Sequence, residues 1–178
     1  MLSNEIFNDD FIFSRKHLLV MMSYLMPKFY PIDFVDNKGT FKDKILGHDV
    51  TLIGCRPNDK YGTKDVINLS VRIRRSIYYK PEKHIDYTED DKERDTMHPD
   101  IHCLGFANKS GTGIEHLMIF SHKSFLLAKE QNLLHSEIHK NTTHSVVSFT
   151  CYPVYYIIKY CVSDFLLGFT EFKTPQSL

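Results

Sequence analysis

The chain has 178 residues, of which 42% are hydrophobic and 25% are charged. This length is sufficient for one buried core, so we expect a single globular domain over residues 1–178. Lys and Arg together number 22, and Asp and Glu together also number 22. This balance excludes a global basic field that would draw the protein onto nucleic acid or an anionic membrane. Any such affinity must come from a local patch.

The first predicted element is a short helix over residues 15–26, with Ser14 as its N-cap and Pro27 as its end. Acidic residues precede its apolar run, which is the reverse of a secretory signal. The longest apolar segment, residues 154–169, is shorter than the roughly 20 residues of a membrane span. We therefore expect a cytoplasmic protein that makes no membrane contact.

A turn at residues 36–39 precedes two predicted strands, over residues 45–53 and 66–74, whose short connection favours an antiparallel pair. The second strand alternates without a break. Its apolar face carries Ile67, Leu69, Val71 and Ile73, and its polar face carries Asn68, Ser70, Arg72 and Arg74. Because side chains in a strand repeat every two residues, this polar face presents two guanidinium groups about 7 Å apart.

The remaining segments complete the predicted fold. Residues 80–98 are strongly charged and are expected to form a solvated loop. After it come a hairpin of strands 101–106 and 114–120, a helix from Ser124 to Asn141, a strand over 145–151 and a final helix from Pro153 to Gly168. This order predicts an α+β (or α/β) domain with a mixed, mostly antiparallel sheet of about five strands and flanking helices.

Two sets of acids stand near these strands. In the first, Asp49 in Gly47-His-Asp-Val-Thr precedes Ser70-Val71-Arg72 on the next strand; in the second, Pro99-Asp100 precedes Glu115 across the hairpin. Both sets resemble the restriction-endonuclease-like PD-(D/E)xK domains, in which an acid on one strand meets an acid and a lysine two residues apart on the next. Ser70 and Arg72 depart from that pattern, and so does Leu117, which occupies the lysine position of the second set.

The resemblance implies a metal-dependent nuclease, or an inactive relative of one. It assigns Asp49, Asp100 and Glu115 as catalytic acids and as ligands of Mg²⁺, because a divalent cation of this kind needs oxygen ligands. The two registers use different acids, and both stay open at this point.

Basic residues around the alternating strand predict phosphate contacts. Lys60 and Lys64 precede this strand, and Arg72, Arg74 and Arg75 lie within or directly after it. We expect these five residues to bind nucleic acid, with DNA preferred over RNA. The alternative interpretation is that the arginines lie on a solvated outer face of the sheet.

Two further hypotheses compete with nucleic-acid binding. Ten Tyr and thirteen Phe suit a non-catalytic module that binds another protein or a second copy of itself through an aromatic surface. His135 and His139 lie four residues apart on the helix predicted from Ser124 to Asn141, and they could share a zinc ion. The sequence offers no third ligand at a diagnostic spacing.

Overall fold

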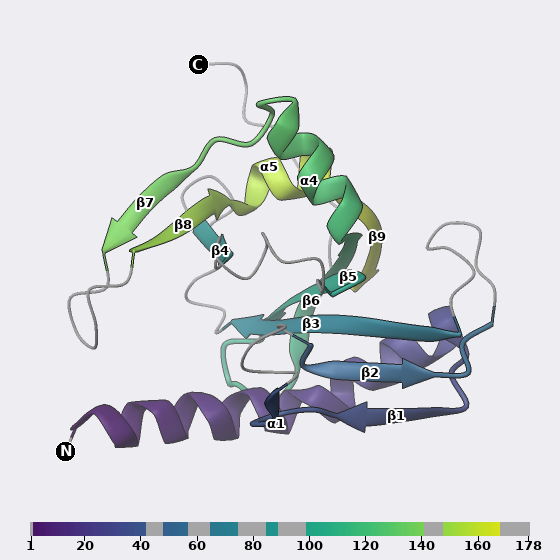
Figure 1. Cartoon of the computed structure of the whole chain (residues 1–178). Helices are drawn as coiled ribbons and strands as arrows, with labels where there is room; N and C mark the ends of the chain where they lie inside the picture. Colours follow the sequence, from purple (N-terminus) through teal and green to yellow (C-terminus); the bar gives the residue numbers. More distant parts are fainter. Residues whose placement is uncertain are drawn as a thin grey trace.

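A computed structural model describes residues 2–41, 48–56, 65–74, 85–88, 99–140 and 148–167. Its fold is α+β (Figure 1). In chain order the elements are α1 (Leu2–Phe29), β1 (Asp33–Asp36), β2 (Val50–Ile53), β3 (Val66–Arg74), β4 (Ile85–Thr88), β5 (Ile101–Ala107), β6 (Ile114–Ser121), α4 (His122–Glu130), β7 (Glu137–Lys140), β8 (Ser148–Pro153), α5 (Val154–Tyr160) and β9 (Val162–Leu167).

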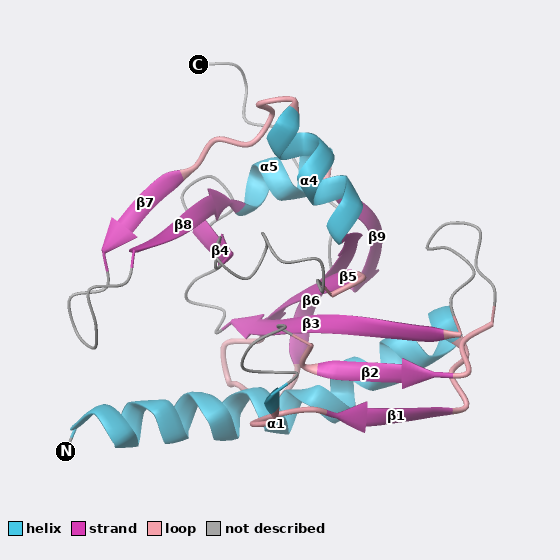
Figure 2. Ribbon diagram, in the orientation of Figure 1, coloured by secondary structure: helices cyan, strands magenta, loops and turns pink. Residues whose placement is uncertain are grey.

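The main sheet has the strand order β1-β2-β3-β5-β6-β9, and a smaller sheet has the order β4-β8-β7 (Figure 2). Strands β3 and β5 run parallel, and the other described pairs are antiparallel. The predicted mixed, mostly antiparallel sheet with flanking helices is therefore confirmed. The antiparallel pairing of β2 with β3 and the hairpin of β5 with β6 are also confirmed.

The central strands β5 and β6 are buried on both faces. Ile101 and Cys103 point into a hydrophobic cluster that includes residues of α1, whereas Leu104 and Phe106 point into a second cluster that includes residues of α4 and α5. Helix α1 thus covers one face of the main sheet, and α4 and α5 cover the other (Figure 1). Burial on both faces explains why these strands read as apolar runs without clean alternation.

Helix α1 is longer than predicted at both ends. It begins at Leu2 and continues through Pro27 to Phe29, so the prediction of a helix confined to residues 15–26 is wrong. Pro27 lacks an N–H donor and disrupts the preceding turn, and the helix ends two residues later.

Helix α4 is shorter than predicted. It ends at Glu130, and Asn132 follows it with a left-handed φ of 54°. The Leu133 N–H donates to the Ala128 carbonyl at 3.0 Å, which closes the helix end in the way that a left-handed Asn allows. His139 consequently lies in β7 and His135 in the preceding loop, so the predicted helical histidine pair is wrong.

The final helix is also shorter than its apolar stripe predicts. Helix α5 ends at Tyr160. The residues after Cys161 form β9, which pairs with β6 as the last strand of the main sheet. Val162 and Phe165 belong to residue types that strands favour. Pairing with β9 satisfies backbone groups of β6 that would otherwise form an open sheet edge, so this pairing prevails over helix continuation.

Two further differences concern segments that the sequence assigned to turns or loops. Residues 33–36 form β1, the edge strand of the main sheet, and residues 85–88 form β4 within the predicted loop 80–98. Strand β4 pairs with β8, a partner about sixty residues later in the chain. Within the described residues, no helix is sufficiently long and apolar to span a membrane.

Candidate functional site

Asp49 and Asp100 each accept a hydrogen bond from the backbone of β3. The Val71 N–H donates to Asp49 Oδ2 at 2.6 Å, and the Asn68 N–H donates to Asp100 Oδ2 at 2.9 Å. Backbone N–H groups an odd number of residues apart point to opposite edges of a strand. The two carboxylates therefore lie on opposite sides of β3, and each extends a hydrogen-bond ladder beyond the neighbouring strand.

Glu115 lies far from Asp100. In the β5–β6 pair, Ile101 is opposite Ser121 and Ala107 is opposite Ile114, so Asp100 and Glu115 lie at opposite ends of the hairpin, about 20 Å apart. Glu115 is exposed at the irregularity of this ladder. The structure thus does not bring these two acids into one site. Within the described residues, no three His, Cys, Asp or Glu side chains are placed to hold a metal ion together.

The predicted basic face is described in part. Arg72 is half-buried and lies opposite Leu104 of β5, on the face of β3 that points away from α1. Arg74 belongs to β3, but its side chain lies outside the described part of the structure, as do the whole of Lys60, Lys64 and Arg75. The phosphate contacts of these five residues stay a prediction.

Four charged residues line one cavity where α1 crosses the end of β1 and the start of β2. Arg15 comes from α1, Asp36 ends β1, Lys38 lies in the following turn and Asp49 precedes β2; we call these four residues the charged corner. They line a cavity of about 20 Å³ whose apolar wall is formed by Leu18, Val50 and Val71. This volume holds about one water molecule or one small cation.

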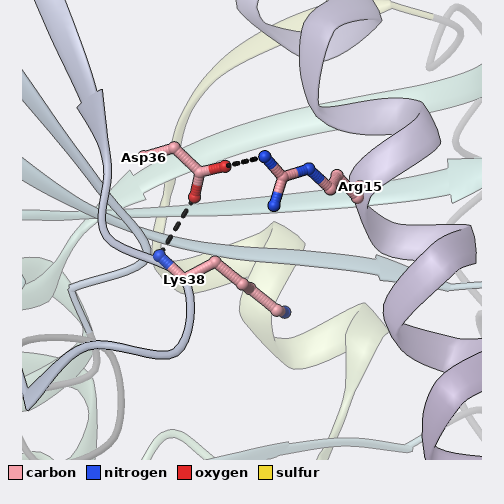
Figure 3. A network of polar contacts seen from close by, with 3 residues as sticks. All are labelled: Arg15, Asp36 and Lys38. Atoms are coloured by element: carbon pink, nitrogen blue, oxygen red, sulfur yellow. Dashed lines mark hydrogen bonds and ion pairs between the residues drawn. The ribbon is translucent and has the colours of Figure 1, made fainter.

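The turn after β1 positions two members of the charged corner. Asp36 Oδ1 accepts a hydrogen bond from the Lys38 N–H at 3.0 Å (Figure 3). Gly39 adopts a left-handed φ of 79°. The Asn37 N–H donates to the Asp49 carbonyl at 2.9 Å. Aspartate side chains favour such turns because they hydrogen-bond the backbone two residues later. The predicted turn at residues 36–39 is thereby confirmed, and it ties Asp36 and Lys38 to the start of β2.

The charged corner is open to solvent at Arg15 and shielded near Asp49. Arg15 Nη2 lies 3.7 Å from Asp36 Oδ2, and the two side chains are 61% and 25% exposed (Figure 3). An exposed pair of this length contributes little to stability, so Arg15 can exchange its partner at small cost. Burial and then the negative charge of Asp49 raise the pKa of the Cys103 thiol. Asp49 itself is half-buried.

Sequence reasoning found Asp49 but missed the other three members of the charged corner. Asp36-Asn37-Lys38 has the acid-x-lysine spacing, and it was assigned only to a turn. On β3, Val71 lines the cavity, whereas Ser70 and Arg72 alternate onto the opposite face. The acid-x-lysine spacing could have indicated Asp36 and Lys38. Nothing in the local sequence indicates Arg15, because only the packing of α1 brings it there.

Comparison of the chain with protein-family models, with curated proteins and with solved structures finds no match.

Proposed function

We propose that this protein binds nucleic acid and that the charged corner contacts the phosphate backbone. The observation that carries the proposal is that Arg15 and Lys38 line one cavity together with Asp36 and Asp49. Arginine and lysine are the side chains that most often contact phosphates. The Arg15 side chain is largely exposed, so a large polyanion can reach it. DNA is the partner we favour over RNA.

Asp36 and Asp49, which both line this cavity, would supply the carboxylate ligands that a magnesium ion needs. Mg²⁺ is commonly held by one or two carboxylates, with waters and substrate phosphates as the other ligands. Asp36 and Asp49 would hold the ion, which would supply neutralisation of developing charge on a phosphoryl group. Arg15 and Lys38 would orient the phosphate. A protein that binds and cleaves is a metal-dependent nuclease, and one that only binds is an inactive relative.

The test is a binding titration with duplex and single-stranded DNA across a range of salt concentrations. The double variant Arg15→Gln, Lys38→Gln should bind more weakly, and its salt dependence should be shallower by about two in the log–log slope, because each lost phosphate contact removes about one. The control variant Lys123→Gln, Lys159→Gln removes the same charge from α4 and α5, on the other face of the sheet. It should bind like the wild-type protein.

Further variants in the same titration distinguish the charged corner from the strand face of β3. Arg72→Gln tests the strand face predicted from the sequence, and a loss confined to this variant would move the site to β3. Asp36→Asn and Asp49→Asn should remove any gain in affinity, or any DNA cleavage, that Mg²⁺ gives the wild-type protein. Both substitutions keep an oxygen that accepts the backbone hydrogen bond. A wild-type protein that binds no DNA at low salt would contradict the proposal.

One observation favours the alternative of a protein-interaction module. Val35, Ile53 and Val66 are exposed on neighbouring strands, and Ile53 and Val66 are direct cross-strand partners. They form an apolar strip on the sheet face that points away from α1. The aromatic surface predicted for this alternative is small in the described residues, where Tyr30 and Phe41 are the exposed large aromatic side chains. The strip, rather than aromatic residues, would be the contact surface.

A further inference from the structure

A second and larger pocket lies at the C-terminal end of α1. It has a volume of about 660 Å³ and is lined by Met26, Pro27, Tyr30, Pro31, Ile32 and Arg56, together with Gly54. We call it the Tyr30 pocket. Its volume lies within the range of about 300–1,000 Å³ that is usual for small-molecule sites.

The backbone holds the Tyr30 ring in an unusual position. Tyr30 directly follows α1 and has a φ of 44°, a left-handed conformation that residues with a side chain rarely adopt. Its N–H donates to the Met26 carbonyl at 2.8 Å, which closes the C-terminal turn of α1. The side chain is nevertheless 57% exposed. Strained residues of this kind cluster at ligand sites, and a glycine would suit the backbone better.

Arg56 lies three residues after the end of β2 and faces Tyr30. Its N–H donates to the Phe29 carbonyl at 3.1 Å, and its guanidinium carbon lies 5.2 Å from the centre of the Tyr30 ring. Gly54 has a φ of 65°, and a Cβ there would lie 2.7 Å from Ile32 Cδ1. Ile32, which is 87% exposed, lies at the rim of the pocket.

The lining chemistry selects for a planar, negatively charged ligand. It combines a phenol ring, a guanidinium group and apolar side chains, and none of the described lining residues carries a carboxylate. Nucleobases stack on aromatic rings and on guanidinium planes in sites that bind single strands. An adjacent phosphate would complement the charge of Arg56.

We infer that the Tyr30 pocket binds a base of single-stranded nucleic acid. The inference rests on the proposed function and extends it. Arg15 and Tyr30 are separated by about 22 Å along α1, from the rise of 1.5 Å per residue. The charged corner and the Tyr30 pocket are therefore separate contacts, one for phosphate and one for a base, that a single strand following α1 would make in succession.

The test compares the dissociation constants of oligothymidine and of an abasic deoxyribose-phosphate strand of equal length. Wild-type protein should bind oligothymidine about five- to a hundredfold more tightly than the abasic strand, which is the usual contribution of one stacked base. Tyr30→Gly removes the ring and also relieves the left-handed backbone, so this variant should fold. It should bind both strands with the affinity that wild-type protein has for the abasic strand, while Tyr30→Phe keeps the preference.

Asn132→Gly is the matched control. Asn132, at the end of α4, is the other described non-glycine residue with a positive φ. Its replacement by glycine relieves the backbone strain there and should not change either dissociation constant. Equal wild-type affinity for the two strands, or a Tyr30→Gly variant that keeps the preference, would overturn the inference and leave the proposed phosphate contacts standing. Failure to bind either strand would remove both. A Tyr30→Gly variant that instead loses self-association in sedimentation would identify a second copy of the chain as the occupant and overturn the inference.

Discussion

Asp100 illustrates how a conspicuous acidic residue can serve the backbone. Its carboxylate accepts the Asn68 N–H, and its own N–H donates to the Asn68 carbonyl at 2.8 Å. Asp100 thus pairs with both the backbone N–H and the backbone carbonyl of Asn68, just before the parallel β3–β5 ladder begins. Hydrogen bonds to charged acceptors are stronger than neutral ones. The Pro99-Asp100 dipeptide therefore has a structural explanation that needs no metal.

We predict that Asp100→Ala lowers the free energy of unfolding by about 1–3 kcal/mol, because it leaves a partly buried N–H without its acceptor. Asp100→Asn keeps an acceptor oxygen and should lose less. Glu115→Ala, at an exposed position, should stay within about 0.5 kcal/mol of wild type. Urea unfolding followed by circular dichroism measures all three. An Asp100→Ala variant as stable as the Glu115→Ala variant would contradict this role.

At the scale of elements, short polar signals decide where α4 begins and ends. Ser121 has an extended backbone, and its hydroxyl oxygen accepts the Ser124 N–H at 3.0 Å, so it is the N-cap. Asn132 ends the helix through its left-handed conformation. The helix is therefore shorter than its leucine pattern predicts, since Leu133 and Leu134 pack on the second cluster from the loop after it.

Loss of the Ser121 cap should destabilise the protein. Ser121→Ala removes the acceptor for the Ser124 N–H and should cost about 0.5–2 kcal/mol, while Ser121→Asp should retain most of the stability because aspartate is also a good N-cap. Thermal denaturation compares the two variants with Ser136→Ala, an exposed serine of the following loop. A melting temperature of Ser121→Ala equal to that of Ser136→Ala would exclude a stabilising cap.

At the scale of the whole molecule, β5 and β6 join the two hydrophobic clusters. Each strand sends alternate side chains to the α1 face and to the face covered by α4 and α5. Neither cluster can lose its packing without exposing one face of the same two strands. The two layers should therefore unfold together, as the single domain expected from the chain length requires.

This coupling predicts one cooperative unfolding transition. Leu25→Ala removes buried volume from the cluster under α1, and Ile157→Ala removes it from the cluster under α5. Each should lower the unfolding free energy by about 2–5 kcal/mol and shift the same single transition. Far-ultraviolet dichroism and tyrosine absorbance should give coincident curves. A variant that shifts only part of the signal would show that the two layers unfold separately.

The sequence by itself determined the elements whose signals are local. The alternation of β3, the turn at residues 36–39 and the hairpin of β5 with β6 were all predicted correctly, because strand periodicity and turn chemistry act over a few residues. These elements were also enough to identify the α+β class. Asp49 was named as a candidate because Gly47-His-Asp-Val-Thr resembles the leading acid of the restriction-endonuclease-like domains, which is again a local feature.

Tertiary structure alone decided which residues share a site. Arg15, Asp36 and Asp49 line one cavity because α1 packs across β1 and β2, and no pattern within one segment records that packing. Pairing also decided β4 and β9, whose partners β8 and β6 supply the backbone hydrogen bonds that their own sequences do not specify. The same packing separated Asp100 from Glu115. The physical reason is that long-range contacts depend on the whole fold, whereas sequence patterns report only neighbours along the chain.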